Sequence, residues 1–507
     1  MLFYTWWLPL CAEAVWKRLD LLHSLDIREG RMKRFIEGDN REQGTLFPDH
    51  LEDFVHEDNP VRAVDAFVDA LDLFGLGFSD AAATGRPGYH PSVLLKIYVY
   101  GYLNRIQSSR RLELEAGRNV EMMWLVGRLA PDFKTIADFR RDNSKAIGSV
   151  CSQFVMLCRQ VGLLDGNVVA IDGSKFKAVN NRDKNFTPTK MKRRMADIEA
   201  SIKKYLSKLD AADRNEPALP AAKVVRLQER IVKLKEQMVE LKAIDIEVQN
   251  APDAQVSLTD PDARSMRHRG SGIVGYNVQT AVEVQHHLIV AHEVTSTGSD
   301  RGLLPKMADK ARLAIGSEQI TVVADRGYYS GEQLLECADN GVITYVPKPL
   351  TSSGTKRGFF IKQDFIYDVK TDVYVCPAGE SLTKGAHRSD RQSTDINFYR
   401  HLTACKDCHL KSRCTTEKLR RIRRWEHEDV LDEIERRLED KPDAMQIRRS
   451  TVEHPFGTLK AWMGYTHFLT RTREKVATEM SLHVLAYNFK RVLNIIGIGP
   501  LMTALEA

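Results

Sequence analysis

Apolar residues recur at helical spacing over a long segment of the N-terminal third of the chain. The stretches PSVLLKIYVYGYLNRI and VEMMWLVGRLA carry them three and four residues apart, and turn signals such as GRPGYHP interrupt the pattern. This spacing places the apolar side chains on one face of a helix. It predicts a compact helical domain between about Asn59 and Gly162.

After Gly162 the pattern changes to short runs rich in β-branched residues. NVVAID, GIVGYNVQTAVEV and HHLIVAHEVT come first, followed by the helical run GLLPKMADKARLAI, the strand ITVVAD, the helical run SGEQLLECADN and the strand VITYVPK. The first three strands can pair as a meander. The later alternation of strand and helix is typical of parallel strands joined by crossover helices. The pattern therefore predicts a mixed α/β sheet.

A helical insertion interrupts this sheet between its first and second strands. Apolar residues alternate gaps of four and three in two stretches, which contain Met191, Met195, Ile198, Ile202, Tyr205 and Leu209, and Val224, Leu227, Ile231, Leu234, Met238 and Leu241. Pro217 and Pro220 lie between the two stretches, so we expect an antiparallel hairpin of coiled-coil-like helices. From Lys190 to Lys242 there are 14 Lys and Arg against 8 Asp and Glu. The hairpin can grip DNA or a second subunit, or it is an ordinary solvated arm.

Four cysteines mark a second insertion, between the last strand and residue 441. Cys376 opens CPAG, and Cys405, Cys408 and Cys414 follow in CKDCHLKSRC. Four thiolates can bind zinc tetrahedrally in a polar segment with little core of its own, with His401 or His409 as substitute ligands. Free thiols in a reducing cytosol are the alternative. The other cysteines, Cys11, Cys151, Cys158 and Cys337, lie in apolar contexts typical of buried positions.

Composition narrows the class of protein. With 507 residues, 43% of them apolar, the chain can form two to four globular units, and its net charge of +6 is compatible with a nucleic-acid partner. No stretch reaches the roughly 18 unbroken apolar residues of a membrane span. The apolar N-terminus contains Pro9 and Glu13 and has no basic segment before it, so we expect a cytoplasmic protein without a signal peptide. If Met32 is the true start, residues 1–31 are an extension.

Arginines gather on the polar faces of the predicted helical domain. They include Arg110, Arg111, Arg140 and Arg141. The planar guanidinium suits phosphate recognition, which makes these residues candidates for DNA binding. For any single arginine, a solvated surface position is the equal alternative.

Three acids carry the candidate chemistry. Asp172 ends the first strand, Asp325 ends the fourth, and Glu453 lies in the charged helix RRSTVEHPFGTLK. If the two strands are neighbours, the two aspartates lie side by side, and a helical acid can reach them across the sheet. Carboxylates that share two divalent ions support phosphodiester chemistry. A lone Glu in such a helix is ordinarily a surface residue, so its assignment depends on the other two acids.

These motifs together resemble the DDE transposases of bacterial insertion sequences. YHPSVLLKIYVYGYL, SSRRLE and PDFKTIADFR are similar to their helical N-terminal domain, and AIDGSKFKA, GYNVQTAVE, ADRGYYS and RRSTVEHPFGTLK to their catalytic core. The resemblance spans about residues 32–498. Many relatives have a tyrosine, arginine, glutamate and lysine signature. Arg449, Glu453 and Lys460 keep its spacing, whereas Gln446 replaces the tyrosine.

The resemblance implies a mechanism and its partners. Asp172, Asp325 and Glu453 would hold two Mg²⁺ ions, with Mn²⁺ as a substitute, and the freed 3′ hydroxyl of a cleaved element end would attack target DNA. Arg449 and Lys460 would hold phosphates, and the helical domain would bind the terminal inverted repeats. Joining two ends at once implies a homodimer. Trp462, which follows Lys460, is ordinarily a core residue, with stacking on a DNA base as the sharper alternative.

The expected fold class is α/β: an RNase H-like mixed sheet core with an N-terminal all-α domain, a helical-hairpin insertion and a small cysteine-bearing insertion. The expected boundaries are an extension at 1–31, a DNA-binding domain at 32–162, the first part of the core at 163–350 with its insertion at 187–250, the cysteine-bearing insertion at 351–440 and the last part of the core at 441–507. The alternative functions are a nuclease of the same fold that never joins strands, and a non-catalytic DNA-binding protein derived from a transposase.

Overall fold

The computed structural model describes residues 50–79, 88–214, 220–268, 271–349, 357–385 and 396–506. Of the described residues, 50–53 and 54–506 belong to two different units, and each is taken by itself. The predicted extension at 1–31 lies outside the described residues, as does Pro217. The other domain boundaries stay predictions.

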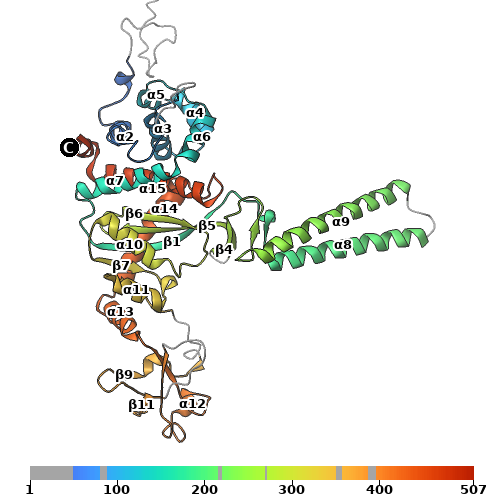
Figure 1. Ribbon diagram of the computed structural model, residues 1–507, viewed down its shortest axis with the longest axis vertical. Coiled ribbons are helices and arrows are strands. Elements are labelled where there is room, and N and C mark those ends of the chain that lie inside the picture. Colours follow the sequence, from blue (N-terminus) through green and yellow to red (C-terminus); the bar gives the residue numbers. More distant parts are fainter. Residues whose placement is uncertain are drawn as a thin grey trace, which may run out of the picture. The chain divides into compact units, whose positions relative to one another are not determined.

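The second unit begins with the predicted helical region. Its helices are α2 (Pro60–Asp69), α3 (Pro91–Leu103), α4 (Ser109–Ala116), α5 (Val120–Leu125), α6 (Phe133–Asp142) and α7 (Ser144–Gln160). Helices α2 and α3 start with a proline, whose missing N–H costs nothing in the first turn. Asp132 caps α6 by accepting from the backbone N–H of Lys134 and Thr135. The expected helices are present, and they form a helical region within the same compact unit as the sheet (Figure 1).

A six-stranded mixed sheet follows. Its strands are β1 (Val168–Lys177), β4 (Arg264–His268), β5 (Ser271–Glu283), β6 (Ile289–Thr295), β7 (Ile320–Ala324) and β8 (Val342–Tyr345). The order is β4-β5-β1-β7-β8, and β6 pairs with β5 along the same edge as β4. Strands β1, β5 and β6 form the predicted antiparallel meander, while β1, β7 and β8 are parallel. Helices α10 (Leu304–Ile315) and α11 (Gly331–Asp339) connect the later strands, as expected.

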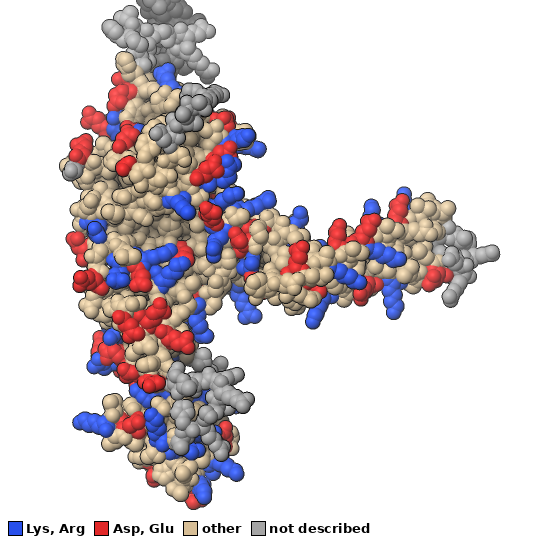
Figure 2. Space-filling view, in the orientation of Figure 1, with Lys and Arg blue, Asp and Glu red and all other residues tan. Residues whose placement is uncertain are grey.

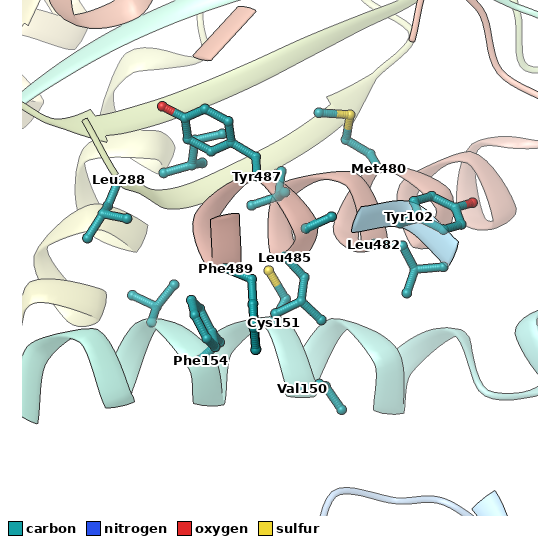
Figure 3. Close-up of a cluster of buried hydrophobic side chains, with 14 of the residues drawn as sticks. Tyr102, Val150, Cys151, Phe154, Leu288, Met480, Leu482, Leu485, Tyr487 and Phe489 are labelled. Carbon is teal, nitrogen blue, oxygen red and sulfur yellow. The ribbon is translucent and has the colours of Figure 1, made fainter. Parts of the chain in front are cut away.

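The main core joins the helical region to the sheet. Helix α15 (Arg473–Ile496) is buried along most of its length and lies beside α7 in Figure 1. Phe489 of α15 stacks on Phe154 of α7 with ring centroids 5.1 Å apart, and Phe67 of α2 meets both rings edge-on. Figure 3 shows this cluster with Leu288, from the turn before β6, above the α7 helix. Because α15 packs on both α7 and β6, the helical region and the sheet share one hydrophobic core.

The insertion after β1 is the predicted antiparallel helical hairpin. Helix α8 (Pro188–Arg214) packs on α9 (Ala221–Asn250), and apolar residues such as Met191, Ile231 and Met238 are buried between them. The short strands β2 (Asn185–Phe186) and β3 (Val256–Ser257) pair where the chain enters and leaves the hairpin. Lys and Arg share the visible hairpin surface with Asp and Glu (Figure 2).

The second insertion contains a five-stranded antiparallel sheet. Its strands are β9 (Ile366–Asp368), β10 (Val373–Val375), β11 (Ser381–Lys384), β12 (Ile396–Arg400) and β13 (Ile422–Trp425), in the order β13-β12-β11-β10-β9. We call it the cysteine-bearing sheet. Its core is a cluster of five buried residues: Phe365, Tyr374, Leu382, Tyr399 and Ile422. The short helix α12 (Lys411–Cys414) lies between β12 and β13.

The chain then returns to the six-stranded sheet through three helical segments. Helix α13 (Glu428–Asp440) is followed by α14 (Ala444–Gly457), and α14 runs into a π-helical turn at Thr458–Trp462. Val452 and Ala444 of α14 pack on Ala170 of β1 and Val323 of β7. The inner face of α14 is therefore held against the two strands that position the candidate acids. Asp325 directly follows β7, as expected, but the expectation that Asp172 ends the first strand is wrong, because β1 continues to Lys177 through its pairing with β5. Helix α16 (Ile498–Glu506) follows α15.

Candidate active site

Asp172 and Asp325 lie on neighbouring strands at the same level of the sheet. Strands β1 and β7 run parallel, with Ile171 paired to Ala324, so the next residue of each chain segment is one of the two aspartates. Asp325 also caps a short 3-10 turn by accepting from Gly327 N at 2.8 Å. The predicted adjacency of the two strands is confirmed. Parallel pairing fixes both carboxylates at one edge of the β1–β7 ladder.

A guanidinium bridges the two carboxylates. Arg448 of α14 places its Nη2 atom 2.8 Å from Asp172 Oδ2 and 3.8 Å from Asp325 Oδ2. The Arg448 side chain is 17% exposed, and its Nε atom is buried without a hydrogen-bond partner. Sequence reasoning missed this residue. The signal was present, because Arg448 lies one helical turn before Val452, which the apolar pattern assigns to the sheet-facing side.

The environment of Asp172 disfavours its charged form. Burial raises the pKa of Asp172 to about 6, and the negative charges of Asp325 and Asp300 act in the same direction. The Arg448 guanidinium and the Gly173 N–H, which donates to Asp172 Oδ1 at 2.8 Å, act in the opposite direction. A half-buried acid of this kind gains from a second positive charge beside it.

A network of polar side chains lies beside Asp172. Asn277 and Gln279 of β5 each donate to Asp300 Oδ1 at 2.8 Å, and Lys175 Nζ lies 3.2 Å from Asp300 Oδ2. A Cβ atom at Gly173 would lie 2.1 Å from Gln279 Nε2 and 2.6 Å from Asp300 Oδ1, so a larger residue there would have to displace the ends of these side chains. Sequence reasoning missed this network, for which the two polar residues at period two, Asn277 and Gln279, were an available signal.

Glu453 lies on α14 but away from the contacts of Arg448. Its side chain is exposed, and so is that of Arg449. Within the described ranges, no three His, Cys, Asp or Glu side chains are grouped as a metal site. The structure thus brings Asp172 and Asp325 together around Arg448, and does not bring Glu453 to them. Five residues separate Arg448 from Glu453, which corresponds to roughly 140° around an α-helix.

Lys460 reaches the strand that carries Asp172. Its Nζ atom donates to Ser174 Oγ at 2.6 Å and to the Lys175 carbonyl at 3.0 Å, and it lies 4.3 Å from the ring centroid of Phe176. The π-helical turn that contains Lys460 widens the helix locally. A cation is therefore held two residues beyond Asp172 along β1.

Trp462 differs from the core position that is usual for a tryptophan. Its side chain is 44% exposed. The Arg105 guanidinium lies 4.1 Å and Lys490 Nζ 3.4 Å from its ring. Two cations at one exposed ring form a surface that suits a nucleic-acid strand.

The four candidate arginines of the helical region differ in their surroundings. Arg110 lies over the Phe133 ring at 5.2 Å, and Arg111 is exposed. Arg141 pairs with Asp138 and Asp142 at 2.5 and 2.7 Å. Arg140 does not lie on the expected solvated face. Its Nη1 atom is 3.3 Å from the Tyr102 hydroxyl and its guanidinium 5.6 Å from the centroid of Tyr98.

A buried acid lies close enough to Arg140 for their charges to interact. Glu479 of α15 accepts hydrogen bonds from Leu469 N and from Thr470, and its carboxylate is fully buried. The positive charge of Arg140 opposes the rise that burial causes in the pKa of Glu479. A buried charge needs such a partner, so Arg140 compensates Glu479 inside the fold.

The four cysteines of the second insertion line one small cavity. Cys376 follows β10, whereas Cys405, Cys408 and Cys414 come from the segment around α12, and all four border a cavity of about 30 Å³ together with His401. Burial raises the pKa of Cys414, and the other three thiols raise it further. The four cysteines predicted from spacing therefore border the same cavity, but in the described ranges they are not grouped closely enough to form a metal site. All seven cysteines of the described part of the chain are free thiols.

The comparisons with known proteins agree with a polynucleotidyl transferase. A family described as "Transposase domain (DUF772)" matches residues 49–142, and one described as "Transposase DDE domain" matches residues 243–489. The chain belongs to the DDE transposase family, whose members are polynucleotidyl transferases that use divalent metal ions. The second match includes Asp325 and Glu453, and Asp172 lies between the two matches.

Two further comparisons add little to the family assignment. No curated protein matches the sequence. Among solved structures, the chain is similar to a piggyBac transposase in a synaptic complex with hairpin DNA, with a TM-score of 0.30 and 6% identity over 88% of this chain and 79% of that chain. This likeness is too distant to guide the site. Separately, every helix in the described ranges is too short or too polar to cross a membrane.

Proposed function

We propose that the chain is the transposase of an insertion sequence, which binds the terminal inverted repeats, cleaves the element ends and joins their 3′ hydroxyls to target DNA. The observation that carries this proposal is the pair Asp172 and Asp325, which lie side by side on parallel strands with the Arg448 guanidinium between them. The mixed sheet with its helical region supports an RNase H-like core. The order β5-β1-β7-β8, with one antiparallel and two parallel pairings, is compatible with that fold.

Asp172, Asp325 and Glu453 are proposed as the ligands of two Mg²⁺ ions, for which Mn²⁺ substitutes. The guanidinium between the two aspartates is a stand-in cation, so the two carboxylates fit a positive ion. When bound, such ions lower the pKa of the attacking hydroxyl and stabilise the leaving oxygen. Glu453 is on the helix that packs against the same two strands, and a rotation or shift of α14 would bring it to them.

Basic residues around this pair are proposed to hold the DNA. Lys460 is already fixed beside β1, and Arg449 is exposed on α14. Arg110, Arg111 and Arg141 of the helical region remain candidates for the element ends. Arg140 is assigned to support that region from inside, through Glu479. Trp462 with its two cations extends the proposed surface from the Lys460 side.

The test is strand cleavage and strand transfer by the purified chain. The substrates are duplexes from the inverted repeats that flank the gene, either intact or already cleaved at the 3′ end. We expect joined product with Mg²⁺, and a loss of at least about a thousandfold in Asp172→Asn, Asp325→Asn and Glu453→Gln. Glu318→Gln, an exposed acid next to β7, is the control and keeps its activity.

Each alternative gives a different result in that assay. Hydrolysis without joined product from pre-cleaved ends identifies a nuclease. Binding of the repeats without cleavage or joining identifies a non-catalytic DNA-binding protein. Activity that persists in all three acid variants removes the catalytic assignment altogether.

The active complex is proposed to be a homodimer on two element ends, and the reaction to take place in the cytoplasm. A reducing compartment agrees with the free thiols of the described cysteines. The mass of the complex with end DNA in solution tests the dimer. One chain bound to two ends would contradict it.

We also propose that Cys376, Cys405, Cys408 and Cys414 hold one structural Zn²⁺. The shared cavity and the effect of the other three thiols on the pKa of Cys414 support this proposal. Elemental analysis of the full chain is expected to give about one zinc per chain, lost in Cys408→Ser and kept in Cys337→Ser, a buried cysteine elsewhere. If the wild-type chain, purified without chelator, contains no zinc, the proposed zinc site is wrong.

A further inference from the structure

The contact between Arg448 and the two aspartates combines three features. One nitrogen, Nη2, serves both Asp172 and Asp325, at 2.8 and 3.8 Å. The guanidinium therefore lies between the carboxylates and is not paired with one of them alone. The exposed fractions of the three side chains are 17% for Arg448, 22% for Asp172 and 43% for Asp325. The position is closed on the side of Asp172 and open on the side of Asp325.

Arg448 is incompletely bonded in this position. Its Nε atom is buried and has no hydrogen-bond partner. A guanidinium that serves a permanent structural pair normally uses its planar fork, with two parallel bonds to one carboxylate. A buried donor without a partner also costs free energy. The arrangement therefore satisfies the charge of the two acids but not the donors of Arg448.

Other charges near the acids are already engaged. Lys175 lies on Asp300, and Lys460 bonds to Ser174 and to the Lys175 carbonyl. Removal of Arg448 would leave Asp172 and Asp325 as two close negative charges, one of them mostly buried. Like charges this close repel strongly in a partly buried site. A positive group at this position relieves that repulsion.

The position of Arg448 is also the one that the proposed metal ligands share. A divalent ion bound by both aspartates and the Arg448 guanidinium cannot occupy the same space. Because Arg448 and Glu453 are roughly 140° apart on one helix, a movement of α14 that brings Glu453 inward would move Arg448 away from the aspartates. Regular helical hydrogen bonds would resist such a movement. They are interrupted at Pro455, inside α14, and at the π-helical turn Thr458–Trp462 that follows α14.

We propose that Arg448 is an internal counter-ion for Asp172 and Asp325, which a divalent ion displaces and which then pairs with a phosphate of the bound DNA. This inference rests on the proposed function. Arginine suits both positions, because its fork binds carboxylate and phosphate with the same geometry. Before DNA arrives, Arg448 competes with the metal. After DNA arrives, the phosphate holds Arg448 and the competition ends.

Two consequences follow from this exchange. Divalent ions bind the chain weakly when no DNA is present, because each must displace a charged side chain. DNA and metal also strengthen each other's binding, and by linkage the effect is equal in both directions. Neutralising Arg448 removes the competition and reduces this mutual effect.

The test is a titration of the full chain with Mn²⁺ in the absence of DNA, in which electron paramagnetic resonance measures the bound ion. We expect Arg448→Gln to bind Mn²⁺ about tenfold more tightly than the wild type, because the ion no longer displaces a charged side chain that is hydrogen-bonded to a carboxylate, and a contact of this kind corresponds to about one power of ten. Arg436→Gln is the control, because Arg436 is an exposed arginine of α13 paired with Glu433. Its Mn²⁺ affinity stays at the wild-type value.

A second readout uses element-end DNA. In the wild type, the DNA is expected to raise the Mn²⁺ affinity more than it does in Arg448→Gln. Arg448→Lys keeps a charge but lacks the fork and the reach to serve both acids, so it is expected to fold and to bind Mn²⁺ more tightly than the wild type. Unchanged or weaker Mn²⁺ affinity in both variants overturns the inference.

The inference and the proposed function fail in different ways. Asp172→Asn is expected to lose Mn²⁺ binding. If Asp172→Asn binds Mn²⁺ as the wild type does, the proposed metal site is wrong. If Asp172→Asn loses the ion while the Arg448 variants match the wild type, the metal site stands and only the role of Arg448 is wrong.

Discussion

The six-stranded sheet and the cysteine-bearing sheet both carry the side chains that we propose as metal ligands, but they differ in what surrounds those side chains. The first belongs to the large core that α7 and α15 complete, and Arg448 neutralises its paired aspartates. The second has a cluster of five buried residues. Four cysteines line a cavity beside that cluster.

Under the proposed function, this difference predicts two uses of metal in one chain. A large core stabilises the fold without an ion, so an ion bound there is free to serve chemistry. A small sheet buries too little apolar surface to be stable alone, and a bound metal supplies what the core lacks. The proposed Mg²⁺ is therefore expected to matter for rate, and the proposed Zn²⁺ for folding.

Removal of metal should separate the two sheets most clearly. Chelation of Mg²⁺ is expected to reduce strand cleavage at least about a thousandfold, because the ions supply several kcal/mol of transition-state stabilisation. Amide exchange in β1 and β7 should stay slow, because the Arg448 guanidinium neutralises the two carboxylates when the ion is absent. A stronger zinc chelator should accelerate exchange in β10 to β12 alone. Faster exchange in β1 after loss of Mg²⁺ would contradict the comparison.

A matched pair of leucines tests the difference in core size. Leu382 of β11 and Leu482 of α15 are each 1% exposed, so Leu→Ala removes the same buried group from the small and the large core. Each change is expected to cost about 2–5 kcal/mol. Hydrogen exchange locates the damage.

The two variants should differ in how far the damage spreads. Leu382→Ala is expected to open residues 357–425 while the six-stranded sheet stays closed. Leu482→Ala is expected to lower the stability of the helical region and the six-stranded sheet together, because Leu482 belongs to their shared core. Equal exchange patterns in both variants would show that the two sheets unfold as one.

Acid should weaken the six-stranded sheet before the cysteine-bearing sheet. Burial lowers the pKa of His292 on β6 to about 4. A lowered pKa means that this stability is present above the unfolded value near pH 6.5 and is lost as the pH falls to about 4. The loss is about 3 kcal/mol from the size of the shift. His292→Gln, measured by thermal unfolding between pH 7 and pH 4, should remove this dependence.

The acid response of the cysteine-bearing sheet begins at a lower pH. Hydrogen bonds from Tyr399 and Tyr367 lower the pKa of Asp372. Its contribution is therefore present above the usual aspartate value and is lost only as the pH falls below it. A simultaneous acid transition of both sheets would contradict this order.

Exposed ion pairs should contribute little in either region. Lys306 pairs with Glu293 beside the six-stranded sheet at 2.5 Å, and Arg436 pairs with Glu433 on α13. Lys306→Ala and Arg436→Ala are each expected to change the free energy of unfolding by less than about 1 kcal/mol. A larger change in denaturant melts would mean that one of these pairs belongs to a more extended network.

Much of the larger sheet could be predicted because its signals are local. Strand and helix order followed from periodicity, and the adjacency of Asp172 and Asp325 followed from the alternation that parallel strands require. Strand β4 was missed. Its sequence RSMRH is polar, and its pairing to β5 is a property of the folded sheet.

The electrostatic details of the site could be predicted only in part. Arg448 and Arg449 are adjacent in sequence, and only the packing of Val452 shows which of them faces the acids. Arg140 carries the same charge as its exposed neighbours, but the buried Glu479, whose charge interacts with it, lies far away in sequence. Both cases depend on contacts between distant segments, which periodicity does not report.

The pairing of β2 with β3 has a consequence for engineering. These two strands pair Phe186 with Val256 at the base of the hairpin. The hairpin is therefore an insertion whose two ends are held together beside the six-stranded sheet. Deletion of seven residues from each helix keeps the apolar seam in phase and leaves that pairing unchanged. The length of α8 and α9 is therefore adjustable independently of the sheet. Variants in which both helices are shortened by one heptad at a time would show which step, DNA binding, cleavage or joining, depends on the length of the hairpin.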